Sequence, residues 1–180
     1  SIGDMAFNNC DAITALVLPS SLTSIGTGAL SCKNVSSVVI SPDNAAYEVW
    51  NGSDCILKKG AGILIQGYIN ATVIPDSVTQ IGDYAYYQIP IQSIDIHDKV
   101  TYIGNYAFAR TGTLKSITSR SMIPPSTGTS NVFTGPAYNG VLMVPSGAIE
   151  AYNETWKKNA AGFLGLSSLN WSIKAINEGE

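Results

Sequence analysis

Charged residues are scarce in this 180-residue chain, at 13% of positions, which is about half the usual share. The 10 Lys and Arg are outnumbered by 13 Asp and Glu, giving a formal net charge of −3. Without a cationic excess there is little to displace counterions from nucleic acid or to attract an anionic membrane, so we expect neither as a partner. No apolar run approaches the roughly 20 residues of a membrane-spanning helix.

Residue types that perform chemistry are equally few. His97 is the only histidine, so any Ser/His/Asp or histidine–metal mechanism would depend on it alone. Its neighbours Asp95 and Asp98 are expected to be solvated rather than to act as an acid–base pair. No cluster has zinc or calcium spacing, and Gly26-Thr27-Gly28 lacks the third glycine of a dinucleotide loop. We therefore expect no enzyme activity, no cofactor and no metal.

What the chain does contain is a recurring motif, Ile-Gly-x-x-Ala followed by an aromatic residue or leucine. Its four copies begin at Ile2, Ile25, Ile81 and Ile103. The starts are 23, 56 and 22 residues apart, so the middle interval holds a repeat and an insertion. A fixed period in this range indicates stacked supersecondary units. The sequence therefore predicts a solenoid.

A short apolar alternation also recurs in each repeat, and alternation at period two is typical of a strand. The pairs expected to face the core are Leu16/Leu18, Val38/Ile40 and Ile94/Ile96. Stacking would place these strands in a parallel sheet, about 4.8 Å apart. The motif glycine suits a turn that a side chain would obstruct, and the alanine suits a close approach of neighbouring coils. We expect a mainly β solenoid with short helical or irregular returns.

These repeats resemble the BspA-like (Treponema pallidum-type) leucine-rich repeat, whose consensus is Ile-Gly-x-x-Ala-Phe, a downstream Cys, spaced aliphatics and Ile-Pro-x-Ser-Val-Thr. The first matching stretch comprises Phe7, Cys10, Ile13, Leu16, Leu18, Pro19, Leu22, Thr23 and Ile25, and the second runs from Ile81 to Phe108. The sequence departs from this consensus at four positions. Leu30 stands in place of the aromatic residue, Ile89 and Thr111 in place of the Cys, and His97 in place of the Pro. The resemblance implies a right-handed leucine-rich-repeat solenoid.

Three cysteines make an odd number, which argues against a disulfide framework. Cys10 and Cys32 occupy equivalent repeat positions, and we expect both to be buried as small apolar residues that resist thiol reagents. A bridge between adjacent rungs is the alternative.

The repeats divide the chain into an array, residues 1–120, and a C-terminal capping region of the same domain, residues 121–180. An insertion at about 41–71 is predicted to contain a β-hairpin, Cys55–Lys58 and Ile63–Gln66, joined by a glycine turn at 59–62. The insertion is interpreted as an extended rung that enlarges the core, with a dedicated binding loop as the alternative.

The capping region is needed because the last rung of a solenoid exposes its core. Ile149, Tyr152 and Trp156 have helical spacing, and Ser146 is the expected N-cap. This end resembles that of many Bacteroidetes members of the family. Residues 162–176 are expected to add one or two strands, and 177–180 to fray.

At the other end, the chain starts inside a repeat, and we expect its first rung to lack a cover. Ile2, Phe7, Ile13 and Leu16 would then be exposed unless upstream repeats pack on them.

The family resemblance implies a cell-surface adhesion module that binds host matrix proteins, host cells or other bacteria. It implies export as well, with the signal and anchor outside this chain. The alternative is a carbohydrate-binding accessory domain of a glycan-utilisation system. Long strips of outward residues along the rungs would favour a protein ligand. Tyr or Trp clustered around an acidic residue in a groove would favour a sugar.

The candidate binding residues follow from the strand alternation. The middle residues of successive strands should form one outward column, flanked by His97 and Arg120: Val17, Val39, Val73, Asp95, Thr118 and Met143. A rival surface lies on the tyrosine-rich return side: Tyr84, Tyr87, Tyr102 and Tyr106. Tyr86 aligns with the core aromatic and is expected to be buried.

Overall fold

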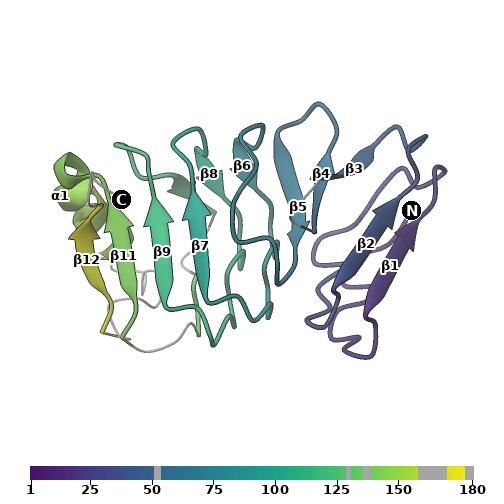
Figure 1. Cartoon of the computed structure of the whole chain (residues 1–180), viewed down its shortest axis with the longest axis horizontal. Coiled ribbons are helices and arrows are strands. Elements are labelled where there is room, and N and C mark those ends of the chain that lie inside the picture. The colour runs from purple at the N-terminus through teal and green to yellow at the C-terminus, as the bar shows by residue number, and fades with distance from the viewer. Residues whose placement is uncertain (51–53, 129–130, 136–138, 158–169, 177–180) are drawn as a thin grey trace.

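The computed structural model describes residues 1–50, 54–128, 131–135, 139–157 and 170–176. Figure 1 shows an elongated solenoid, with rungs stacked along the long axis and a short helix at the C-terminal end. The predicted β-solenoid is confirmed. Within the described residues, no helix has the length and apolarity needed to cross a membrane.

One side of the solenoid carries the parallel strands that the apolar alternation predicts. β1 (Ala15–Leu18) pairs with β2 (Ser37–Ile40). A separate four-stranded sheet contains β7 (Ser93–Ile96), β9 (Ser116–Ser119), β11 (Val141–Val144) and β12 (Ser172–Ala175). Alternate residues point inward and are buried, as at Leu16/Leu18 and Ile94/Ile96, whereas Ile40 is only half-buried.

The motif isoleucines stack on another side of each rung. Ile81 lies opposite Ile103, and Ile2 opposite Ile25. The six-stranded sheet on this side runs in the order β10 (Ser126–Thr127), β8 (Tyr102–Ile103), β6 (Gln80–Ile81), β5 (Ile63–Gly67), β4 (Cys55–Lys58) and β3 (Tyr47–Trp50).

The insertion is an enlarged rung built into this six-stranded sheet. The predicted hairpin is confirmed, since β4 and β5 pair in antiparallel, but β3 is a further strand that the sequence did not reveal. Ile56, Leu57 and Leu64 are buried in the common core, which supports the extended-rung interpretation. The inserted strands join only this sheet. The parallel strands on the other side are consequently divided between β2 and Val73.

An aromatic stack runs through the core along the solenoid axis. The rings of Tyr86 and Phe108 stack at 5.1 Å, Phe108 and Phe133 at 5.2 Å, and Phe133 meets Trp156 of the cap at 5.6 Å. All four are buried, so the expectation for Tyr86 is confirmed. Its hydroxyl donates to the Ala71 carbonyl at 2.9 Å, which satisfies the polar atom that Tyr86 brings into the core.

The motif glycine lies where adjacent rungs approach most closely, a role that the sequence pattern suggested for the alanine. A Cβ on Gly104 would lie 2.5 Å from the backbone nitrogen of Asp83 on the preceding rung. The Asp83 Oδ1 atom also accepts the Asn105 N–H at 2.7 Å, and Asp4 accepts the Thr27 N–H in the same way. The glycine and the aspartate together draw two rungs into contact.

The C-terminal cap contains α1 (Ile149–Tyr152), preceded by a 3₁₀ turn, Ser146–Ala148, and followed by a π-helical turn, Asn153–Lys157. Tyr152 and Trp156 face the core as predicted, and Trp156 Nε1 donates to the Pro125 carbonyl at 3.1 Å. The predicted N-cap is wrong: Pro145 occupies the cap position and no side chain bonds there, because Ser146 already belongs to the turn. β12 is one final strand, while 162–169 and 177–180 lie outside the described residues.

Cys10 and Cys32 are free thiols, and the burial of one of them differs from the expectation. Cys32 is fully buried, but Cys10 is only half-buried. Cys32 Sγ donates to the Phe7 carbonyl at 3.1 Å. Burial raises the pKa of the Cys32 thiol to about 11, so this thiol remains protonated at neutral pH.

Candidate functional site

Two surfaces contain the residues that the sequence singled out, with the exception of Tyr102. The strand surface comprises the outward residues of the parallel strands with their flanking side chains: Val17, Val39, Val73, Asp95, His97, Thr118, Arg120 and Met143. The tyrosine cavity, on the return segments, is lined by Tyr84, Tyr87, Tyr106, Ala109, Arg110, Asn131, Thr134 and Gly135.

Strand register places the outward residues opposite one another, but in two blocks. Asp95 pairs with Val73 on one side and with Thr118 on the other, and Thr118 pairs with Met143. Val17 pairs with Val39 in the separate β1–β2 sheet. The expectation of a single column is therefore corrected, because the insertion divides the strands between β2 and Val73. Register also adds Lys174 next to Met143, a residue that sequence reasoning missed.

The three valines give the strand surface its apolar character. Val17 is 77% exposed, and Val39 and Val73 are each 53% exposed. Thr118 and Met143 are half-buried. A groove of about 390 Å³ runs beside β2, and its lining includes Val39 together with Glu48 and Val49 of β3. Exposed apolar side chains in a row cost solvation and are typical of interaction surfaces.

A bidentate ion pair stands in the second block. Arg120 donates from Nε to Asp95 Oδ1 at 2.9 Å and from Nη2 to Oδ2 at 2.6 Å. The hydrogen bonds and charge of Asp95 raise the pKa of the Arg120 guanidinium. Both side chains are substantially exposed, so the pair contributes at most about 1 kcal/mol to stability. Its main effect is to hold one positive and one negative group in fixed positions on the surface.

His97 is half-buried and bonded to the backbone on both sides of its ring. Nδ1 accepts the Lys99 N–H at 3.2 Å, which leaves the proton on Nε2, 2.9 Å from the Pro75 carbonyl oxygen. These contacts bind the turn after β7 to the preceding rung. No group of three or more His, Cys, Asp and Glu that could hold a metal occurs among the described residues.

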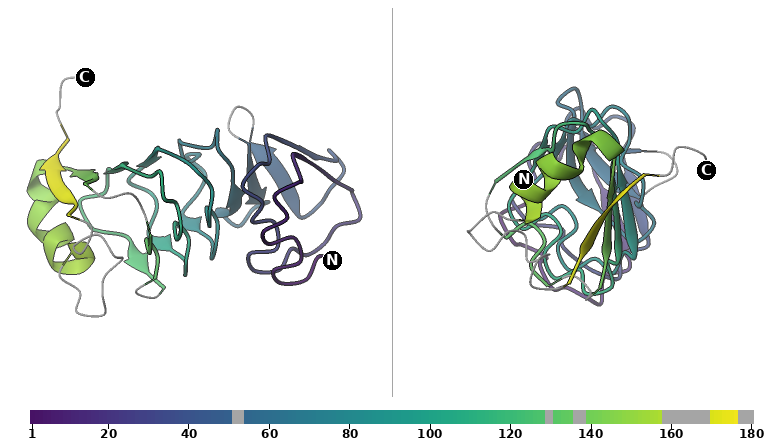
Figure 2. Two further views of the ribbon diagram at one scale, coloured as in Figure 1. Left: turned by 90° about the horizontal axis from the view of Figure 1, so that it is seen from below. Right: turned by 90° about the vertical axis from the view of Figure 1, so that its left-hand side faces the viewer.

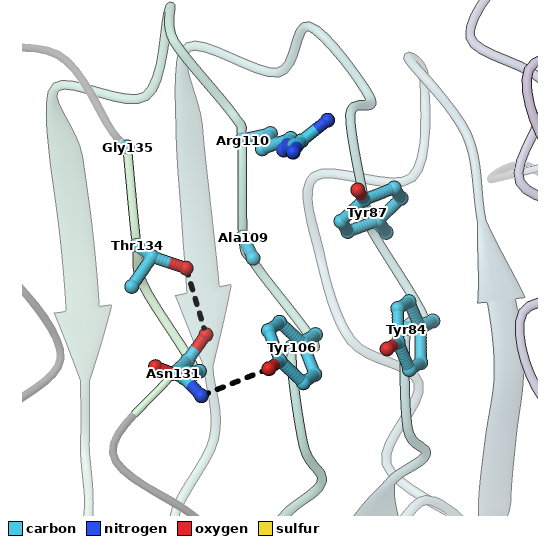
Figure 3. Close-up of a pocket in the computed structure, with 8 residues that line it drawn as sticks. All are labelled: Tyr84, Tyr87, Tyr106, Ala109, Arg110, Asn131, Thr134 and Gly135. Atoms are coloured by element: carbon cyan, nitrogen blue, oxygen red, sulfur yellow. Dashed lines mark hydrogen bonds between the residues drawn. The ribbon is translucent and has the colours of Figure 1, made fainter.

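The tyrosine cavity has a volume of about 550 Å³ and is shown in Figure 3. Tyr84 and Tyr106 stack with ring centroids 5.0 Å apart, and Tyr87 meets Tyr84 edge-on at 5.1 Å. The Arg110 guanidinium lies 5.7 Å from the centre of the Tyr87 ring. Three of the four predicted tyrosines thus gather here. Tyr102 does not line the cavity, because it belongs to β8.

Polar groups hold the rim of the cavity in place. Asn131 Nδ2 donates to the Tyr106 hydroxyl at 2.9 Å, and Thr134 Oγ1 donates to the Asn131 carbonyl at 3.1 Å. Burial, and then the neighbouring Tyr106, Tyr87 and Asp83, raise the pKa of Tyr84, so its hydroxyl stays protonated at neutral pH.

The backbone at the cavity is in the left-handed region, which normally favours glycine. φ is 60° at Tyr84, 54° at Tyr106 and 58° at Arg110. Gly28, at the position equivalent to Tyr84, adopts φ 61° without a side chain. A larger residue there costs about 1–2 kcal/mol. The side chains of the cavity are retained despite this cost.

Sequence reasoning missed Arg110, Asn131 and Thr134. Arg110 could have been noticed, because it occupies the same repeat position as Asn9 and Gln88. In the structure all three residues have positive φ. Asn131 and Thr134 could not, because the motif fades before residue 131. The expected sign of a sugar site, tyrosines around an acidic residue, is also altered: the charged side chain that lines this cavity is an arginine.

The comparisons with known proteins agree with the repeat fold. A family model described as BspA type leucine rich repeat region matches residues 1–58 and 66–135, in 6 copies. Among solved structures, a leucine rich cell surface protein from Faecalibacterium prausnitzii is similar over 99% of this chain and 51% of its own, with a TM-score of 0.62 and 21% identity.

Two further solved structures share the fold. The pneumococcal vaccine antigen PcpA is similar over 76% of this chain and 40% of its own, with a TM-score of 0.58 and 14% identity. A leucine-rich repeat protein from Eubacterium ventriosum is similar over 78% and 47%, with a TM-score of 0.50 and 17% identity. The chain thus spans about half the length of these proteins or less. No curated protein matches the sequence.

Proposed function

Because the chain belongs to the BspA-type leucine-rich repeat family, we propose that it is a non-catalytic protein-binding module that acts outside the cell or at a bacterial cell surface. Its partner is a protein of the host matrix, of a host cell or of another bacterium. The observation that carries the proposal is the strand surface, where exposed side chains from successive rungs stand in register. Adhesion follows if the partner is itself anchored.

The strand surface supports this function by its rigidity and its composition. Backbone pairing holds each outward side chain at a fixed spacing, so little conformational entropy is lost on binding. Val17, Val39 and Val73 supply apolar area. The Asp95–Arg120 pair supplies charges of both signs, which select a partner more than they strengthen binding.

The contacts of the histidine support a function without catalysis. The ring nitrogens of the sole histidine face backbone groups, so His97 has no side chain to activate. The solved cell surface protein from Faecalibacterium prausnitzii shares the fold along nearly the whole chain. Location at a cell surface is proposed by analogy with that protein.

The test is a binding screen against extracellular-matrix proteins, with variants of the strand surface. Val39→Asp and Val73→Asp should each weaken binding of the protein found by about 1 kcal/mol or more, roughly fivefold in Kd. Ile123→Asp is the matched control, because Ile123 is 78% exposed but outside both blocks. If both valine variants bind as well as the parent and a Tyr87→Ala variant does not bind, the partner contacts the tyrosine cavity and the strand-surface proposal is wrong.

A second candidate function, carbohydrate binding, is favoured by the tyrosine cavity. Its aromatic rings and polar rim offer what a sugar ring needs, a flat apolar surface bordered by hydrogen-bonding groups. The cavity residues lie on the return segments and none belongs to a strand of the strand surface, so the two activities are separable by mutation.

A further inference from the structure

We propose that the tyrosine cavity binds a sugar that carries a carboxylate, with Arg110 as the residue that recognises the acidic group. The inference rests on the second candidate function and is independent of protein binding on the strand surface. It names both the class of ligand and the side chain that selects it.

The aromatic residues favour a sugar over a peptide side chain. Tyr84, Tyr87 and Tyr106 present ring surfaces and edges with hydroxyl groups at their tips (Figure 3). A pyranose ring likewise has apolar C–H faces and a border of hydroxyls, so the two match in both character and size. Ala109 is the one purely aliphatic side chain among the described lining residues. A leucine or valine anchor of a peptide would therefore find no aliphatic pocket.

The hydrogen-bonding groups are already partly ordered. The Tyr106 hydroxyl is fixed by Asn131, whose own backbone carbonyl is held by Thr134. In the described part of the chain, the hydroxyls of Tyr84 and Tyr87 have no hydrogen-bond partner. These two groups can donate to and accept from a ligand without breaking an existing bond, and preorganisation of this kind lowers the cost of binding.

Arg110 supplies the one charge among the described lining residues. It is exposed, its guanidinium lies against the Tyr87 ring, and no carboxylate pairs with it in the described part of the chain. Arg120, by contrast, already donates from Nε and Nη2 to the two carboxylate oxygens of Asp95. A free guanidinium fork matches the two oxygens of a carboxylate.

We expect the ligand to carry a single acidic group at the cavity, and we do not expect a densely charged polyanion. The chain has a net charge of −3, which repels highly charged polymers over distance. The cavity also has no lining carboxylate among the described residues to accept the hydroxyls of a neutral sugar. One acidic group at Arg110, with the neighbouring sugar surface on the tyrosines, satisfies both conditions. Uronic acids and sialic acids share this chemistry.

The test measures binding of matched acidic and neutral sugars by isothermal titration calorimetry. The acidic probes are trigalacturonate and 3′-sialyllactose, and their neutral counterparts are the trimethyl ester of trigalacturonate and the methyl ester of 3′-sialyllactose. We expect at least one acidic probe to bind about tenfold or more tightly than its counterpart, because a charge-assisted bidentate contact is lost in the neutral form. Which acidic probe binds distinguishes a uronic acid from a sialic acid.

Arg110→Gln should abolish this preference, and Arg120→Gln, which removes an exposed arginine elsewhere, should retain it. Thermal unfolding checks that both variants fold. Val39→Asp should leave sugar binding unchanged, because Val39 lies outside the cavity. The strand-surface proposal and the sugar proposal can therefore fail independently. Equal binding of acidic and neutral sugars, binding of neither acidic probe at millimolar concentration, or equal losses in the two arginine variants would overturn the proposal. Tighter binding of triglutamate than of either sugar would assign the cavity to an acidic peptide and overturn it as well.

Discussion

Single residues decide how closely the rungs of this solenoid approach. Gly26, Gly82 and Gly104 each lie against the backbone of the preceding rung, and a Cβ on Gly82 would be 2.8 Å from the Leu64 carbonyl oxygen. The constraint is spatial and not one of backbone torsion, since these glycines do not have positive φ. Positive φ occurs two residues later, at Gly28, Tyr84 and Tyr106, and there side chains are tolerated.

The glycine of the first motif, Gly3, is a control for this spatial constraint, because its Cβ position does not lie against another rung. Gly104→Ala should lower the free energy of unfolding by about 1–3 kcal/mol, because the added methyl group forces two rungs apart. Gly3→Ala should change it by less than about 0.5 kcal/mol, since Gly3 has no atom within 4 Å of the Cβ position. Urea unfolding of both variants measures the difference. Similar effects of the two substitutions would mean that rung contact is not the reason for the glycine.

Among the elements, the cap and the insertion both pack on the common core but have different effects on the array. The cap closes the last rung by placing Trp156 against Phe133 and Tyr152, at 5.6 Å and 5.0 Å between ring centres. The Tyr152 hydroxyl also bonds to Ser119 at 2.7 Å, which ties the cap to β9. The insertion instead adds strands to one sheet and interrupts the strands on the other side.

The cap can be tested with two tryptophans of different exposure. Trp156→Ala should lower the free energy of unfolding by about 3–5 kcal/mol, because it removes a side chain that is only 1% exposed and leaves the end of the aromatic stack open. Trp50→Ala, at a side chain that is 38% exposed, should cost less than about 1 kcal/mol. Chemical denaturation compares them. A Trp156 variant as stable as the parent would show that the cap does not support the array.

For the whole molecule, stability depends on the number of neighbours that each rung has. Figure 2 shows the N-terminal rungs at one end of the stack and the cap helix at the other. Phe7 in the first motif is 38% exposed, whereas Phe108 at the equivalent position is fully buried. A cavity of about 370 Å³ lined by Phe7, Leu16 and Leu30 opens at that end. In an array with nearest-neighbour coupling, such a rung lacks one interface.

Amide hydrogen exchange should therefore be uneven along this chain. Residues 1–20 are expected to exchange faster than residues 81–109, because opening the first rung breaks contacts on one side only. Mass spectrometry of peptic fragments measures both regions in one experiment. Equal protection of the two regions in a monomeric sample would show that the first rung is stable by itself. Slow exchange together with dimer formation would show that another copy covers it.

Local spacing in the sequence was enough to predict the repeat, the parallel strands of the apolar alternation and the buried aromatic ring, whereas β3 was missed. Ile2, Ile25, Ile81 and Ile103 mark the rungs, and alternation of apolar residues separates the inward from the outward side of each strand. The hairpin in the insertion was predictable for the same reason, since glycines stand between two short apolar runs.

Which elements became neighbours depended on packing across the whole molecule. The hairpin could have extended either sheet, and its pairing with β6 divided the predicted outward column into two blocks. Arg110 joined the tyrosines through the stacking of returns from different rungs, and Asn131 came from a stretch that lacks the Ile-Gly-x-x-Ala motif. Ser146 lost its predicted capping role because the turn began one residue early. Local patterns specify the side on which a residue lies, but contacts between rungs depend on register, which is set by packing of the whole core.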